Sequence, residues 1–174
     1  ERLITDYSQM LRDEAAISSE KMKKINLAEV VKSVVDDFNS VYDTKKSIAI
    51  NFKTNGQNNY EILAIENRIE QIIANLLENS ISFSEKNQAI DVELAKKDED
   101  KITLIVSDEG VGFNENDTNK IFNRFYSNRP EKFGEHSGLG LNIVKNLVEI
   151  HGGEITASNN EDKGARIEIN FPKA

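Results

Sequence analysis

The stretch Asp108-Glu109-Gly110-Val111-Gly112 decides the predicted fold, and Ser137-Gly138-Leu139-Gly140-Leu141 follows it further along the chain. The first closes a strand predicted over residues 102–108, and the second opens a helix predicted over residues 139–150. Glycine permits a tight turn behind an acidic side chain because it has no Cβ. A helix N-terminus offers free N–H groups and the positive end of its dipole to phosphates. Two such signatures predict a nucleotide site, and ATP is the ligand that we expect.

The composition narrows the classes of protein that fit. At 174 residues, the chain is long enough for one well-filled core and an appended element. Its formal net charge of −8 argues against a nucleic-acid or anionic-membrane surface, since both need clustered Lys and Arg. The absence of cysteine excludes a disulfide scaffold, thiol catalysis and thiolate metal sites, and it fits a reducing compartment. No stretch approaches the roughly 20 apolar residues of a membrane span, so we expect a soluble piece.

The sequence divides near residue 26. Apolar positions recur with helical spacing through residues 1–24 amid many charges, which predicts a helix whose apolar stripe needs a partner. We expect this segment to be either the end of a longer helix or a surface helix packed on its own domain. Asn26 is a candidate N-cap for a second helix that runs to Phe38.

The rest of the chain predicts an α+β fold with a mixed sheet in one layer and helices on one of its faces. Residues 66–83 carry the apolar stripe of a core helix. The polar stretch 114–136 predicts a long loop with a short helix near Ile121, and such loops are usually functional or disordered. Alternating apolar residues and turn signals predict strands on both sides of Asn55-Gly56, over 90–94 and 102–106, and on both sides of Lys163-Gly164.

The helix predicted over 66–83 also holds polar candidates. At roughly 100° per residue, Asn75 and Asn79 lie one turn apart on the same edge of the apolar stripe, and Arg68 lies close to that line. Their amides can point into a pocket while the stripe beneath them stays in the core. An Asn oxygen is a neutral ligand of the kind that Mg²⁺ accepts while it keeps most of its waters and bridges to phosphates. The alternative is that the two Asn residues cap or solvate a helix edge.

Five motifs stand in the order of the N, G1, F, G2 and G3 boxes of sensor histidine kinases. They are Asn75-Leu76-Leu77-Glu78-Asn79, Asp108-Glu109-Gly110-Val111-Gly112, Ile121-Phe122-Asn123-Arg124-Phe125-Tyr126, Ser137-Gly138-Leu139-Gly140-Leu141 and Lys163-Gly164. Over about residues 27–172 the chain resembles the catalytic ATP-binding domain of these kinases, in the GHKL superfamily. The resemblance implies a two-layer α/β sandwich of the Bergerat type. The run from Phe125 to Pro130 and on to His136 is similar to ChvG-type envelope sensors.

The resemblance also implies an organisation into two parts. Residues 1–25 resemble the C-terminal part of a second dimerisation helix with its linker, and residues 26–174 resemble the catalytic domain. The implied partners are the dimerisation and histidine-phosphotransfer domain of the same kinase and, through that domain, a response regulator. The parent protein is expected to be a homodimer and an inner-membrane sensor with this portion in the cytoplasm.

The resemblance gives each box a role. Asp108 would accept a hydrogen bond from the adenine amino group, Phe83 would stack beside the ring, and Gly110 and Gly112 would let the chain pass close to it. Asn79 would ligate Mg²⁺, with Asn75 as its neighbour at the phosphates. Gly138 and Gly140 would present backbone N–H groups to the phosphates, and the G2 contact would be completed by Ser137, Leu139 and Leu141. The loop 114–136 would be the ATP lid.

Three positions depart from the pattern of the family. Ser82 stands where a Lys usually precedes the aromatic residue of the N box, and a serine cannot neutralise phosphate. Ser127 stands where an Arg often follows Phe-Tyr, so the catalytic arginine is either Arg124 or Arg129. His136 stands in place of the first glycine of G2, which predicts a stiffer hinge for the lid.

The two histidines lack the setting of a phosphoacceptor. Kinases of this type phosphorylate a histidine that lies on the first dimerisation helix and is followed by an acidic residue, whereas His136 lies in the expected lid. His151 closes a helix, where an imidazole near the negative end of the dipole is an ordinary structural choice. The resemblance therefore implies that the γ-phosphoryl group of ATP passes to a histidine outside this chain.

Three functional classes stay open. The first is an ATP-dependent phosphoryl donor that acts on a histidine of another segment. The second is an ATPase of the same superfamily, whose N box carries a Glu base where this chain has Asn75, an amide without useful basicity. The third is a nucleotide-binding module without catalysis, and only a transfer assay separates it from the first.

Overall fold

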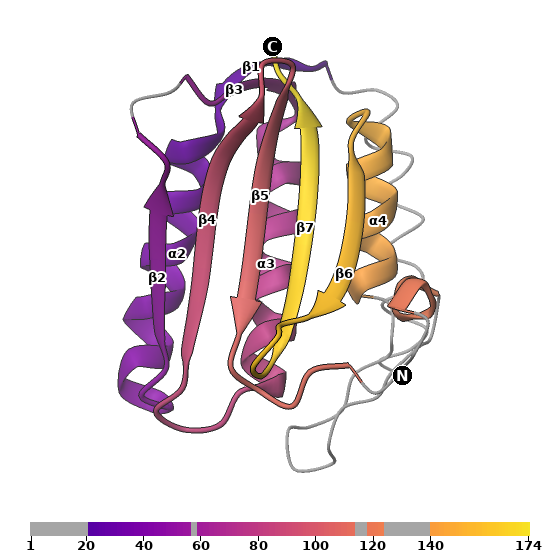
Figure 1. Ribbon diagram of the computed structural model, residues 1–174. Helices are drawn as coiled ribbons and strands as arrows, with labels where there is room; N and C mark the ends of the chain where they lie inside the picture. The colour runs from indigo at the N-terminus through magenta and orange to yellow at the C-terminus, as the bar shows by residue number, and fades with distance from the viewer. Residues whose placement is uncertain (1–20, 57–58, 114–117, 124–139) are drawn as a thin grey trace, which may run out of the picture.

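The computed structural model describes residues 21–56, 59–113, 118–123 and 140–174 (Figure 1). In that part of the chain, five strands form a sheet in the order β2-β4-β5-β7-β6, and β1 pairs with β3. The strands are β1 (Lys23–Asn26), β2 (Ala49–Thr54), β3 (Glu61–Ala64), β4 (Ala89–Asp98), β5 (Lys101–Asp108), β6 (Glu154–Asn159) and β7 (Ala165–Pro172). The helices are α2 (Leu27–Lys45), α3 (Glu66–Phe83), α4 (Gly140–Ile150) and the short 3₁₀ helix η1 (Thr118–Phe122).

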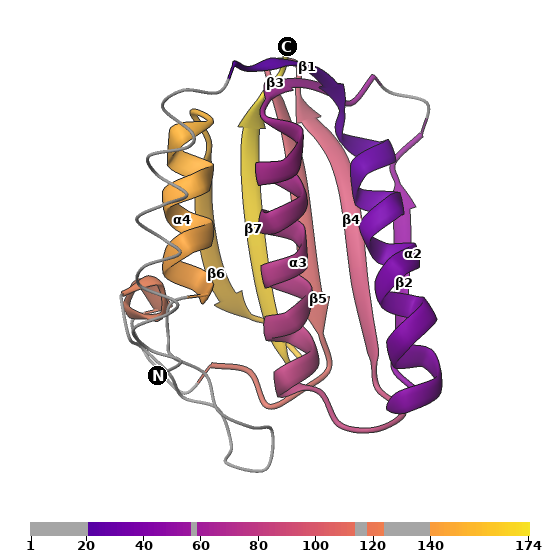
Figure 2. The same cartoon turned by 180° about the vertical axis from the view of Figure 1, so that it is seen from behind.

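The predicted α+β fold with a mixed sheet is confirmed. Strand β2 runs parallel to β4, and the other pairs in the large sheet are antiparallel. Helices α2, α3 and α4 all lie on one face of this sheet, as the two opposite views show (Figures 1 and 2). The apolar stripe of α3 explains its place in the centre, because its side chains are almost fully buried: Ile69, Ile72, Ile73, Leu76 and Leu77.

The N-terminal boundary of α2 is where the sequence predicts it. Asn26 has extended backbone angles, and its Oδ1 accepts a hydrogen bond from the Ala28 N–H at 3.0 Å. This bond satisfies one of the N–H groups that the first turn of a helix leaves without a partner. Asn26 is thus confirmed as the N-cap.

The end of the helix predicted over residues 1–24 is wrong. Most of that range lies outside the described residues, but Lys23 and Lys24 belong to strand β1. The backbone of β1 pairs with β3, with Lys24 opposite Leu63, and Ile25 is buried in the core. Tertiary pairing therefore overrides the helical spacing at this point.

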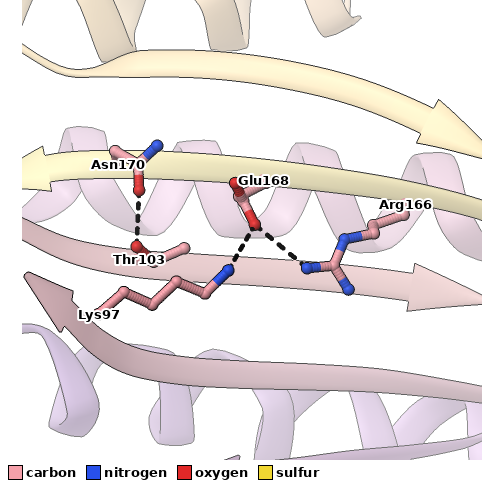
Figure 3. Close-up of polar contacts among 5 residues, drawn as sticks. All are labelled: Lys97, Thr103, Arg166, Glu168 and Asn170. Atoms are coloured by element: carbon pink, nitrogen blue, oxygen red, sulfur yellow. Dashed lines mark hydrogen bonds and ion pairs between the residues drawn. The ribbon is translucent and has the colours of Figure 1, made fainter.

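The face of the sheet without helices is covered by polar side chains of its own strands (Figure 3). Glu168 accepts hydrogen bonds from Lys97 Nζ and Arg166 Nη2, both at 3.1 Å. Thr103 Oγ1 donates to Asn170 Oδ1 at 2.6 Å, and Thr103 is only 1% exposed. The long side chains of Lys97, Arg166 and Glu168 thus lie over the centre of the sheet, which is how a helix-free face keeps water from it.

The ends of several helices and strands lie together at the lower end of the molecule in Figure 1. Strands β5 and β6 and helix α3 end there, α4 begins there, and β6 turns into β7. The opposite end holds β1, β3 and the end of α4. Within the described residues, no helix combines the length and apolar character needed to cross a membrane.

Candidate nucleotide-binding site

Asp108 is the last residue of β5 and is 3% exposed. Its Oδ1 accepts hydrogen bonds from the Gly110 N–H at 2.9 Å and from the Ala165 N–H at 3.1 Å. The Ser80 side chain also donates to this carboxylate. Burial raises the pKa of Asp108 above its ordinary value of 3.8, although the three hydrogen bonds act in the opposite direction. A buried carboxylate held by several donors is costly to the fold, which marks it as a candidate functional group.

Two glycines bring backbone segments against each other around Asp108. A Cβ on Gly110 would overlap the Phe83 carbonyl, so the end of α3 touches the turn after β5. A Cβ on Gly164 would overlap the Asp108 carbonyl, and Gly164 has a φ of +93° that L-residues rarely adopt. The end of α3, the G1 turn and the G3 turn therefore meet directly.

The aromatic position of the N box lies beside the turn after β5. Phe83 is 4% exposed, and its ring meets Phe113 edge-on with centroids 6.3 Å apart. Edge-to-face contacts of this kind fix the orientation of both rings. Phe83, Phe113 and Asp108 thus form one corner of the domain, built from α3, β5 and the segment that follows β5.

The two amides of the N box differ in burial. Asn79 is 4% exposed, and its backbone carbonyl accepts a hydrogen bond from Ser82 Oγ at 2.7 Å. Asn75 is half-buried one turn earlier, and Glu78 is exposed. Asn79 precedes Phe83 by one helical turn, so the polar edge of α3 runs toward the same end of the molecule as Asp108. Asn75, Asn79 and Phe83 thus follow one another at intervals of one turn along α3, and their part in a nucleotide site stays a prediction.

The G2 box is described only in part. Helix α4 begins at Gly140, and Leu141 is buried beneath it. In the described part of the chain, a Cβ on Gly140 would meet no atom within 4 Å. The remaining predicted site residues lie outside the described residues, as does most of the expected lid. They are Arg124, Arg129, Ser137, Gly138 and Leu139.

A short helical turn precedes α4 in the structure. The helix expected near Ile121 is present as η1, and the Phe122 carbonyl accepts a hydrogen bond from Asn142 Nδ2 at 3.0 Å. This bond ties η1 to the first turns of α4.

The sequence reasoning missed three residues that support the site. Ser80 contacts Asp108, as described above. Asn159 Oδ1 accepts from the Phe113 N–H at 2.7 Å, and its Nδ2 donates to the Phe113 carbonyl at 3.0 Å. Asn160 Nδ2 donates to the Asp108 carbonyl at 3.1 Å. The only signal in the sequence is a pair of Asn residues just before a glycine turn, and Asn is common at turns for purely local reasons.

His151 serves the fold at the opposite end of the molecule. Its Nδ1 lies 2.7 Å from the Leu147 carbonyl, and its Nε2 accepts from the Ile65 N–H at 3.2 Å. Burial lowers the pKa of His151 below 6.5, and the hydrogen bond to Leu147 only partly opposes this effect. A neutral imidazole that links α4 to the start of α3 agrees with a structural role.

Comparison with known proteins identifies the family of this chain. The family model described as histidine kinase-, DNA gyrase B-, and HSP90-like ATPase matches residues 64–174. The chain belongs to this family. More narrowly, it is a catalytic ATP-binding domain of the kind found in two-component sensor kinases, as the following relatives show.

The sensor protein ChvG of Agrobacterium fabrum is 36% identical over 186 residues, which cover 100% of this chain and 31% of that protein. The chain therefore spans about a third of the length of this relative. The solved catalytic domain of histidine kinase ThkA has a TM-score of 0.76 and 27% identity, over 88% of this chain and 97% of that one. ThkA in complex with the response regulator protein TrrA has a TM-score of 0.76 and 24% identity, over 98% and 48%.

Proposed function

We propose that this chain binds ATP with Mg²⁺ and donates the γ-phosphoryl group to a histidine on a dimerisation domain. The observation that carries the proposal is the buried carboxylate of Asp108, held by Gly110, Ala165 and Ser80 at the end of β5. Both backbone donors go to Oδ1, so Oδ2 can accept the adenine amino group. A fixed acceptor of this kind selects adenine over guanine, which presents a carbonyl at the same position.

The other end of the nucleotide is assigned to two helices. Asn75 and Asn79 of α3 would face the phosphates, and the N-terminus of α4 at Gly140 would offer them backbone N–H groups. Ser137, Gly138, Leu139 and Leu141 complete this proposed contact. Phosphoryl transfer also needs a cation beside the transferred group, and Arg124 or Arg129 would supply it.

The donor set fits Mg²⁺ better than a metal held by protein alone. In the described residues, no group of three or more His, Cys, Asp or Glu side chains is placed to hold a metal. Mg²⁺ commonly keeps several waters and binds through one or two oxygen ligands together with substrate phosphates. The amide oxygen of Asn79 would be such a ligand, and the ion would neutralise phosphate charge that Ser82 cannot.

The proposed partners follow from the relatives. ThkA is solved with a response regulator protein, and ChvG is a sensor protein. We therefore infer a response regulator as the final acceptor and a dimerisation domain as the direct one. Residues 1–25 would belong to that dimerisation segment, residues 26–174 would form the catalytic domain, and the parent sensor would be a homodimer with this part in the cytoplasm.

An ATPase is the second candidate, because the family includes ATPases. Hydrolysis needs a base that orients and deprotonates water. Asn75 occupies the relevant edge of α3, and Glu78 is an exposed residue on another side of the helix. The described residues therefore favour transfer over hydrolysis.

The deciding experiment mixes the chain with radiolabelled ATP, Mg²⁺ and a dimerisation-helix fragment that carries the acceptor histidine. We expect acid-labile, base-stable label on the fragment and none on the chain alone. Asp108→Asn is the matched control, because it should fold and fail to transfer. Phosphate release without label on the fragment would contradict the proposal in favour of an ATPase, and binding without either would indicate a non-catalytic module.

A further inference from the structure

We propose that Asn159 is a positioning residue of the adenine end of the nucleotide site, although it lies outside every sequence motif of that site. The inference rests on the proposed function, since it assigns Asn159 a part in ATP binding. Asn159 is the last residue of β6, a strand at the edge of the large sheet. Its amide acts on Phe113, which lies in the segment after β5.

The contact between Asn159 and Phe113 has the form of a strand pairing. The Phe113 N–H donates to Oδ1 at 2.7 Å, and Nδ2 donates to the Phe113 carbonyl at 3.0 Å. One side chain thus satisfies both backbone groups of a residue that belongs to no strand. Both bonds are made to Phe113, whereas the Gly110 N–H earlier in the same segment donates to Asp108 Oδ1.

The Asn159 amide lies close to the backbone of Gly112 as well. A Cβ on Gly112 would lie 2.7 Å from Asn159 Oδ1, and Gly112 has a φ of +76°. A side chain at position 112 would therefore displace the amide as well as strain the backbone. The second glycine of the G1 box leaves room for Asn159, in addition to any approach to a nucleotide.

Through Phe113, Asn159 also affects the corner of the domain formed by Phe83, Phe113 and Asp108. Phe113 is 8% exposed, and its ring meets the ring of Phe83 edge-on at 6.3 Å. Phe83 is the residue that we assign to the adenine ring. By fixing the backbone of Phe113, Asn159 holds the ring that supports Phe83, and it keeps the turn after Asp108 in place. Asn159 touches no proposed substrate atom, so its role is positioning.

The chain offers a matched control for this chemistry. Asn39 on α2 makes the same pair of amide-to-backbone bonds with Ile50 on β2: the Ile50 N–H donates to Oδ1, and Nδ2 donates to the Ile50 carbonyl, both at 2.9 Å. Strand β2 forms the other edge of the sheet, away from Asp108. Asn39→Ala therefore removes equal hydrogen bonding without touching the proposed site.

The test measures the Kd of ATP and of ADP by calorimetry for the wild type, Asn159→Ala and Asn39→Ala, with melting curves for all three. We expect both variants to melt at lower temperature by similar amounts. Only Asn159→Ala should weaken nucleotide binding, by about tenfold, and by the same factor for ATP and ADP because the adenine end is common to both. Equal Kd values for all three proteins would overturn the proposal, as would a loss confined to ATP.

A second variant keeps the proposal falsifiable if Asn159→Ala is poorly folded. Phe113→Leu keeps the backbone bonds to Asn159 and removes the ring that contacts Phe83. If Asn159 acts through that ring, Phe113→Leu alone weakens ATP binding, and an unchanged Kd of this variant would overturn the proposal without any use of Asn159→Ala. When Asn159→Ala does fold, the double variant should lose less affinity than the two separate losses combined. Fully additive losses would overturn the route through Phe113. A wild-type chain that binds no ATP would instead overturn the proposed function, which separates the two failures.

Discussion

At the scale of single residues, the fold and the proposed site favour different protonation states of Asp108. Burial raises its pKa, so the ionised form that could accept a hydrogen bond from adenine is the form that the fold disfavours. The Gly110 and Ala165 N–H groups and the Ser80 hydroxyl reduce this cost without removing it. A carboxylate kept under such conditions is better explained by ligand recognition than by stability.

Asp108→Asn should therefore separate binding from folding. The Asn Oδ1 can still accept from Gly110 and Ala165, but the second atom becomes an NH₂ donor that faces the donor of adenine. We expect ATP binding to weaken by about 10- to 100-fold, because two buried donors would oppose each other. Calorimetry with ATP measures this loss, and a melting curve checks the fold. An unchanged Kd, or equal competition by GTP and ATP in the wild type, would contradict the role of Asp108.

Gly164 makes a second residue-scale prediction, about stability. Gly164→Ala should destabilise the protein by about 2–4 kcal/mol, because its Cβ would overlap the Asp108 carbonyl and its φ is positive. Urea unfolding measures this change. Gly140→Ala is the control, since no described atom lies within 4 Å of its Cβ and its N–H is retained. Equal stability of both variants would show that Gly164 is not in close contact with the Asp108 carbonyl.

At the scale of helices and strands, the sequence predicts what local patterns determine. The apolar stripe of α3, the Asn26 cap and the placing of Asp108 at the end of β5 follow from spacing and from residue type. Strand β1 does not, because its backbone partner β3 is far along the chain. The amide of Asn159 likewise acts on Phe113, across 46 positions of sequence. Contacts between remote segments leave no periodic signal.

His151 links two of these helices, and the link should depend on pH. Only the neutral ring with its proton on Nδ1 can donate to the Leu147 carbonyl and accept from the Ile65 N–H. Because the folded pKa of His151 lies below 6.5, its contribution is complete above pH 6.5 and is lost as the pH falls from 6.5 through the folded pKa. His151→Leu should cost about 1–3 kcal/mol at neutral pH.

The measurement is urea unfolding of the wild type and His151→Leu at about pH 7.5 and about pH 5.5. The wild type should lose stability between these values more steeply than the variant, since the variant has no ring to protonate. Parallel losses in the two proteins would contradict this account of His151.

At the scale of the whole molecule, the fold has one face covered by helices and one covered by its own polar side chains (Figures 2 and 3). The helix-covered face holds the apolar core, whereas the hydrogen-bonded side chains of Lys97, Arg166 and Glu168 lie over the other face. Burial by itself raises the pKa of Glu168, but the hydrogen bonds and charges of Lys97 and Arg166 outweigh it and lower the pKa below 4.5. The ionised carboxylate of Glu168 thus stabilises the fold, whereas the ionised carboxylate of Asp108 destabilises it.

These opposite shifts predict opposite changes in stability. Glu168→Gln should lower the free energy of unfolding at neutral pH by up to about 1 kcal/mol, because the pair is partly exposed. That deficit should vanish as the pH falls from 4.5 through the folded pKa of Glu168, where the wild type also loses its charge. Asp108→Asn should instead match or exceed the wild type at neutral pH. Its advantage should vanish as the pH falls through the raised pKa of Asp108, where the wild-type carboxyl takes up its proton.

Urea unfolding from about pH 7 to about pH 3.5 tests both changes in one series. The two variants should lie on opposite sides of the wild type at neutral pH and approach it in acid. Asp108→Asn should approach the wild type as the pH falls from the raised folded pKa of Asp108 to 3.8, and Glu168→Gln as the pH falls from 4.5 to the lowered folded pKa of Glu168. If Asp108→Asn is the less stable protein at neutral pH, burial of the carboxylate is not a cost to the fold, and the presence of Asp108 does not need ligand recognition to explain it.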